Sequence, residues 1–101
     1  MNAPDTHDGI VQLYASQIID HADAAQAGAP VSALAMASVD KAMMHFRTLD
    51  GGRATATLLQ RLGSMLRAAA LAPGRLEPSR LVLIAAADYA ANAARGFDGT
   101  S

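Results

Sequence analysis

The sequence predicts an all-α protein, an antiparallel four-helix bundle that associates with a second copy of itself. In four segments, apolar residues recur at spacings of three and four, which is the period of an amphipathic helix. Short connections containing glycine or proline separate these segments, and short connections favour antiparallel neighbours. No segment alternates apolar and polar residues as a half-buried strand does.

The stretch from Arg53 to Leu71 is the clearest amphipathic helix. Its apolar face carries Thr55, Leu58, Leu59, Leu62, Met65, Leu66 and Ala69. Its polar face carries Arg53, Thr57, Gln60, Arg61, Ser64 and Arg67. Because such an apolar face must be buried, other segments have to pack over it. Gly63 costs this helix about 1 kcal/mol relative to alanine. It indicates either a close approach of another backbone or weak local selection.

A first helix is expected from Gly9 to Ala27, with Asp8 as its N-cap and Gly28 just after its end. Its buried stripe consists of Ile10, Val11, Tyr14, Ala15, Ile18, Ala22 and Ala25. The polar residues 1–8 before it are expected to be disordered.

A second helix is expected from Pro30 to Leu49, with Ser32 as another possible cap, and Asp50-Gly51-Gly52 is a strong stop signal. Its buried face consists of Val31, Ala35, Met36, Val39, Ala42, Met43, Phe46 and Leu49. Leu34 and Met44 fall outside this face. They are candidates for apolar side chains left on the surface.

Pro73-Gly74 ends the third helix, and Pro78 suits the first turn of a fourth that runs to Arg95. This last helix is apolar on nearly all sides, so it should lie centrally or in an oligomer interface. The residues expected to carry self-association are Leu81, Val82, Ala86, Tyr89 and Ala90. The domain therefore spans residues 9–96, and residues 97–101 form a flexible tail.

Composition limits the possible functions. The 101 residues suit one domain, and much of the 51% apolar content is alanine, so the core is thin. The chain has no cysteine, no signal peptide and no transmembrane segment, which together predict a cytoplasmic protein that does not bind membranes. The net charge of −1 gives no global basic field for nucleic acid.

Charge is unevenly distributed between the two halves of the chain. Residues 1–50 carry six aspartates against Lys41 and Arg47, a formal charge of −4. Residues 51–101 carry six arginines against Glu77, Asp88 and Asp98, a formal charge of +3. The two halves can attract each other within one chain or between chains, or form ordinary solvated faces.

No residue pattern specifies a catalytic or metal site, and no cofactor is expected. A di-iron bundle needs several inward glutamates, and the chain has one, Glu77. His21 and His45 each border an apolar face. An enzyme or ligand carrier built on either histidine, or haem ligation with Met36 or Met43, is a weaker hypothesis than a hydrogen-bonded structural histidine.

The leading hypothesis is therefore a non-enzymatic protein-binding module: a small adaptor, anti-activator, chaperone or inhibitor of a larger protein. Its expected partner-binding residues are Arg53, Arg61, Arg67 and Met44. The alternative is a DNA-binding transcriptional regulator that uses the arginine face of the third helix. Residues 58–64 resemble the start of a helix-turn-helix. The would-be recognition helix, however, offers Arg67 alone for reading bases.

Overall fold

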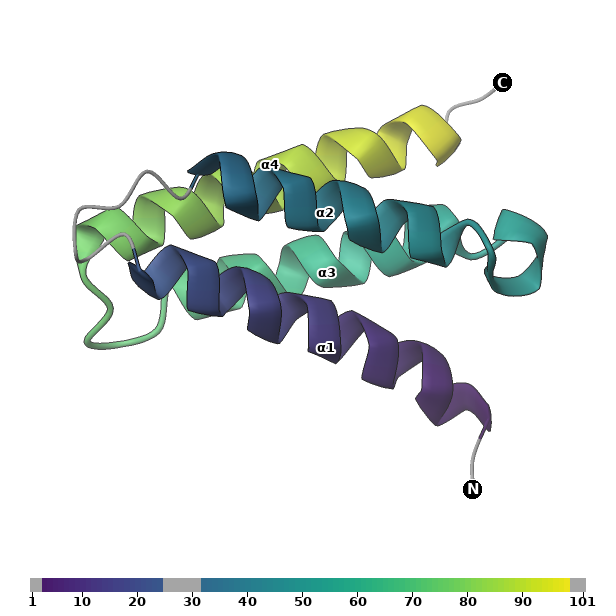
Figure 1. Ribbon diagram of the computed structural model, residues 1–101, viewed down its shortest axis with the longest axis horizontal. Helices are drawn as coiled ribbons and strands as arrows, with labels where there is room; N and C mark the ends of the chain where they lie inside the picture. The colour runs from purple at the N-terminus through teal and green to yellow at the C-terminus, as the bar shows by residue number, and fades with distance from the viewer. Residues whose placement is uncertain (1–2, 25–31, 99–101) are drawn as a thin grey trace.

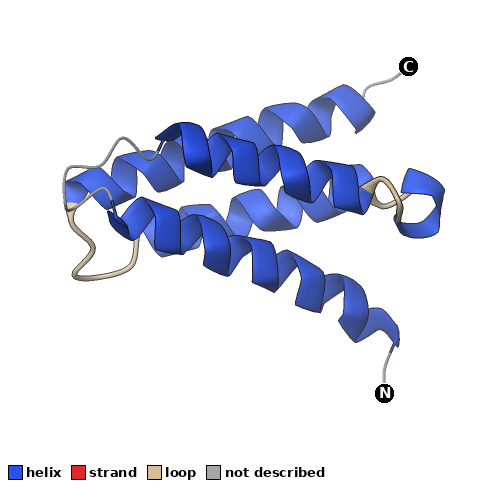
Figure 2. Ribbon diagram, viewed as in Figure 1, coloured by secondary structure: helices blue, strands red, loops and turns tan. Residues whose placement is uncertain are grey.

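The computed structural model describes residues 3–24 and 32–98. Four α-helices follow one another along the chain: α1 (Ala3–Ala24), α2 (Ser32–Phe46), α3 (Thr55–Ala70) and α4 (Glu77–Asp98). A short 3-10 helix, η2 (Leu49–Gly52), lies between α2 and α3. The described residues include no strand (Figure 2). The predicted all-α class and four-helix bundle are confirmed.

Consecutive helices run in opposite directions (Figure 1). α1 and α2 form one layer and α3 and α4 form the other, which fits a molecule of 39 × 34 × 19 Å. Both ends of the described chain lie on the same side of the bundle (Figure 1). Within the described part of the chain, no helix is both long enough and apolar enough to cross a membrane.

The helix boundaries differ from the predicted ones mainly at α1. This helix begins at Ala3, so it includes residues 3–8 of the segment that we expected to be disordered. Asp8 therefore lies inside the helix and is not its N-cap. The residues predicted to close the first helix and open the second, 25–31, lie outside the described residues. At the other end of the chain, α4 continues to Asp98, three residues beyond the predicted end.

The connection between α2 and α3 follows the predicted stop signal. Gly51 and Gly52 have φ angles of 67° and 86°, a region that glycine adopts without steric cost. The Thr55 hydroxyl donates a 2.8 Å hydrogen bond to the Gly52 carbonyl oxygen and so ties the turn to the first residue of α3. α2 ends at Phe46, three residues before the predicted end at Leu49.

The core is built mainly from the predicted apolar stripes. Some members of these stripes are only half-buried, namely Ile10, Tyr14, Met36, Met43, Leu49, Met65 and Ala69, and Ala25 and Val31 lie outside the described residues. The largest fully buried side chains of the core include Phe46, Ile18, Leu59, Leu62, Leu66 and Leu83. Of the nineteen buried apolar residues described, nine are alanine, which confirms that the core contains few large side chains. Tyr14 adds an edge-to-face contact with Phe46 at a ring-centroid distance of 6.0 Å.

The α3–α4 pair is the most closely packed pair of helices. A Cβ placed on Gly63 would lie 3.2 Å from the Ala87 carbonyl oxygen and 3.7 Å from the Ala90 Cβ. The expectation that Gly63 marks a close backbone approach is therefore confirmed. α4 also packs against α1 and α2, but each of the other helices likewise packs against the remaining three, so α4 is no more central than they are.

Candidate functional site

Two of the three arginines predicted on the polar face of α3 form ion pairs with neighbouring helices, which the sequence did not indicate. Arg61 forms an ion pair with Asp8 of α1, and Arg67 forms one with Asp88 of α4. About half of each of these side chains is exposed. The polar face of α3 has no acidic residue of its own, but the neighbouring helices supply one carboxylate to each of these two arginines.

The four residues predicted to bind a partner do not form one surface. Arg53 is exposed in the turn before α3, and no ion pair joins it to the described residues. Met44 is 66% exposed, but it lies on α2, in the layer of α1 and α2. Arg61 points toward α1, and Arg67 points toward α4. The four predicted residues therefore do not make up a single partner-binding site.

The residues predicted to carry self-association differ in exposure: three are buried and two are exposed. Val82, Ala86 and Ala90 are buried in the core of the single chain, so in this fold they are not available to a second copy. This part of the prediction is corrected: α1, α2 and α3 cover the apolar side of α4. Leu81, at 58% exposed, and Tyr89, at 37%, remain on the surface.

Tyr89 links the two layers through α2. Its hydroxyl donates a 2.7 Å hydrogen bond to the Asp40 carboxylate. This hydrogen bond raises the pKa of Tyr89 above its ordinary value of 10.0, because the carboxylate favours the protonated phenol; desolvation and the Asp40 charge act in the same direction. The Tyr89 side chain is therefore held in place by a contact within the same chain, its hydrogen bond to Asp40.

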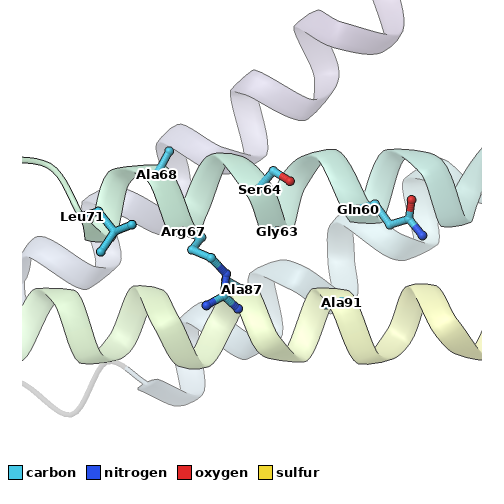
Figure 3. A pocket seen from close by; sticks show the side chains of 8 residues that line it. All are labelled: Gln60, Gly63, Ser64, Arg67, Ala68, Leu71, Ala87 and Ala91. Carbon is cyan, nitrogen blue, oxygen red and sulfur yellow. The ribbon is translucent and has the colours of Figure 1, made fainter.

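A groove runs along the outer side of the α3–α4 seam (Figure 3). It has a volume of about 460 Å³ and is lined by Gln60, Gly63, Ser64, Arg67, Ala68, Leu71, Ala87 and Ala91. Gly63 and Ala87 are buried at the bottom of the groove, and Ala91 is half-buried beside them. Leu71 is 72% exposed, more than any other large apolar side chain described.

The groove combines an apolar floor with a polar edge. Gly63, Ala87 and Ala91 are the small residues at the seam, and Leu71 adds apolar area at the end of α3. Gln60 and Ser64 lie along α3, and the Arg67 side chain extends toward α4 near Ala87 (Figure 3). Such a surface offers van der Waals contact along its floor and directional hydrogen bonding at its edge.

The two histidines considered as ligands are placed differently. The Tyr14 hydroxyl lies 3.0 Å from His45 Nδ1, and the two rings meet edge to face at 5.8 Å. His45 follows Met36 by nine residues and Met43 by two, so both methionines lie on the opposite side of α2 from His45 and neither can join it at one haem iron. His21 is partly buried. The described residues contain no group of three or more metal-ligating side chains.

Sequence reasoning missed a polar cluster at the end of the bundle. Arg75 forms an ion pair with Asp23 of α1, and its Nε donates a 2.8 Å hydrogen bond to the Ala69 carbonyl oxygen. The fully buried Ser79 donates a 2.8 Å hydrogen bond to Asp23 and accepts one from Arg75 at 3.2 Å. This cluster joins the ends of α1, α3 and α4.

The groove was also missed, although part of its signal was in the sequence. The small residues of α4 indicated that a neighbouring helix could approach closely, and Gln60, Ser64 and Arg67 belonged to the predicted polar face of α3.

Comparison of the chain with protein-family models, with curated proteins and with solved structures gave no match. What the groove can bind must therefore follow from the chemistry of its own residues.

Proposed function

We propose that the protein is a non-enzymatic protein-binding module whose groove on the α3–α4 seam docks a helix of a larger protein. The observation that carries this proposal is the groove itself: about 460 Å³, with small residues at the seam and the exposed Leu71 at one end. Recognition of a helix in a groove uses this combination of apolar floor and polar edge. An adaptor, anti-activator, chaperone or inhibitor would act through such a surface.

Blocking the groove tests this proposal. Ala68 is exposed and lines the groove, whereas Ala37 is exposed on α2, in the other layer. The wild type, Ala68→Trp and the matched control Ala37→Trp are used as baits in nuclease-treated lysate of cells that express the protein naturally. Circular dichroism first shows that both variants are folded.

We expect the wild type and Ala37→Trp to retain the same protein in stoichiometric amounts and Ala68→Trp to lose it. Retention of that protein by all three baits would exclude the groove as the docking site. Retention of no protein by the wild type would contradict the binding-module proposal.

DNA binding is the second candidate, and the ion pairs of Arg61 and Arg67 count against it. A carboxylate beside each arginine reduces the positive potential that phosphates would meet. A DNA-binding protein would show a steep fall of affinity with salt, and replacing Arg53, Arg61 and Arg67 together by alanine would abolish binding. Unchanged DNA affinity in that variant would remove this candidate.

Self-association is a separate proposal, since the single chain already buries most of the α4 face that suggested it. It now rests on Leu81 and Tyr89, the two residues of the predicted set that remain exposed on α4. Light scattering across micromolar concentrations tests it, and a one-chain mass throughout would refute a dimer.

We also propose a cytoplasmic location for the protein, because the chain has no cysteine.

A further inference from the structure

The charge around the groove limits what can occupy it. Among the side chains whose exposure is described on α3, on α4 and in the turn before α3, the exposed charged ones are Arg53, Arg61, Arg67, Arg80 and Arg95 against Glu77 and Asp88. Asp8 and Asp88 offset Arg61 and Arg67, so the positive excess of the layer that forms the groove comes from Arg53, Arg80 and Arg95 against Glu77, although the whole chain has a net charge of −1. An occupant with the opposite charge would be attracted to this layer and oriented on it.

The opposite layer has the opposite charge. The charged side chains described on α1, α2 and the turn after α2 are Asp8, Asp20, Asp23 and Asp40 against Lys41 and Arg47. A two-fold dimer through the groove would place two positive layers face to face, which like-charge repulsion disfavours. Contact between the positive layer of one copy and the negative layer of the next would continue from copy to copy without closing. A second copy therefore fits the groove poorly.

Building on the function proposed above, we infer that the groove binds an acidic amphipathic helix of a partner protein. The apolar stripe of this helix lies over the exposed Ala68 and Leu71 of α3 and the half-buried Ala91 of α4, above the buried Gly63 and Ala87. Close packing is possible there because none of the three seam residues carries a side chain larger than a methyl group. Gln60 and Ser64 hydrogen-bond with polar side chains at the edge of the bound helix.

Arg67 is the residue that reads the partner's charge. It lines the groove, and its guanidinium is paired with Asp88, both side chains being more than half exposed. An ion pair this exposed is weak, so a carboxylate of the incoming helix can replace or share Asp88. The guanidinium fork presents several N–H donors and holds a carboxylate in a defined orientation. Asp88 thus competes with the partner for Arg67.

This competition gives Arg67 and Asp88 opposite expected effects. Arg67→Gln removes the donor and should weaken binding of an acidic helix about five-fold or more. Asp88→Asn removes the competing carboxylate and should strengthen binding about two-fold or more. Asp20→Asn is the matched control, because it makes the same change of net charge at an exposed position on α1. It should leave the affinity unchanged within the error of measurement.

The probe is a phage-displayed library of helical peptides with alanine and leucine fixed at spacings of three and four and all other positions randomised. Peptides are selected on the wild type. The enriched peptides are then synthesised, and their Kd values for the wild type and each variant are measured by fluorescence anisotropy. We expect Asp and Glu to be enriched over Lys and Arg. The affinity should fall with added salt, and binding should be lost in Ala68→Trp but not in Ala37→Trp.

Enrichment of basic or neutral peptides, enrichment of no peptide, or equal effects of Asp88→Asn and Asp20→Asn would overturn this inference. The proposed function would survive that result if the lysate experiment still showed a protein lost only in Ala68→Trp. If Ala68→Trp affected neither the selected peptides nor the captured protein, both the inference and the proposed docking site would fail.

Discussion

Gly63 of α3 packs directly against the backbone of Ala87 in α4, where an added Cβ would lie 3.2 Å from the Ala87 carbonyl oxygen. That separation is tighter than most Cβ contacts, and a carbonyl oxygen within a helix cannot move away as the end of a flexible side chain can. Glycine at this position thus sets the spacing of α3 and α4. Since the groove lies on the same seam, this spacing also sets the groove's floor.

Gly63→Ala should destabilise the protein even though alanine is the better helix former. Overpacking costs about 1–3 kcal/mol, and the gain in helix propensity returns about 1 kcal/mol, so we expect a net loss of up to about 2 kcal/mol. Chemical denaturation measures this change. The matched control is Gly9→Ala in α1, where an added Cβ meets nothing within 4 Å. It should gain about 0.5–1 kcal/mol. A stability gain in both variants would disprove the close contact.

Asp23→Ala should cost about 1–2 kcal/mol, because it leaves the buried Ser79 hydroxyl without its acceptor and Arg75 without its carboxylate. The exposed Asp20 on the same helix supplies the control, and Asp20→Ala should change stability by less than about 0.5 kcal/mol. In a Ser79→Ala background the cost of Asp23→Ala should shrink, since one of the lost interactions is already absent. Equal costs in both backgrounds would mean that Ser79 and Asp23 are not coupled.

Leu62→Asp should unfold the protein. Leu62 is fully buried in α3, and an unpaired charge at that position costs more than about 4 kcal/mol, a large part of a small domain's stability. Leu13→Asp introduces the same charge at a position that is 57% exposed, and it should keep the parent helical signal. Circular dichroism during heating compares the two variants. A Leu62→Asp protein that melts like the parent would contradict the burial of α3.

Tyr89 should titrate above its ordinary pKa of 10.0 because its hydroxyl donates a hydrogen bond to Asp40. The folded protein then holds the phenolic proton more tightly than the unfolded chain. The stability contributed by this group is fully present below pH 10 and is lost as the pH rises through the raised pKa. Tyrosinate absorbance measures the titration in a Tyr14→Phe background, where Tyr89 is the one remaining tyrosine.

In that background Asp40→Asn should move the pKa of Tyr89 back toward 10.0, whereas the control Asp20→Asn should not. The same midpoint in the presence and absence of the Asp40 carboxylate would show that the hydrogen bond does not form in solution.

The sequence by itself determined the four helices, their buried faces and the turn at Gly51-Gly52. These features depend on local physics: a 3.6-residue period marks the apolar stripe of α3, and two glycines allow positive φ between α2 and α3. Leu62 was identified as a core residue, and Leu34 and Met44 as exposed residues, because the position of a residue on its helix decides these properties.

Tertiary structure alone decided which faces meet. The sequence showed that α4 is apolar around most of its surface, but its own neighbours and a second copy would satisfy that surface equally well. The bundle assigned Val82, Ala86 and Ala90 to the core of one chain. Asp8 and Arg61 are 53 residues apart, so no local pattern could pair them. The groove likewise depends on how α3 and α4 are aligned against each other, because its floor combines Gly63 of one helix with Ala87 of the other.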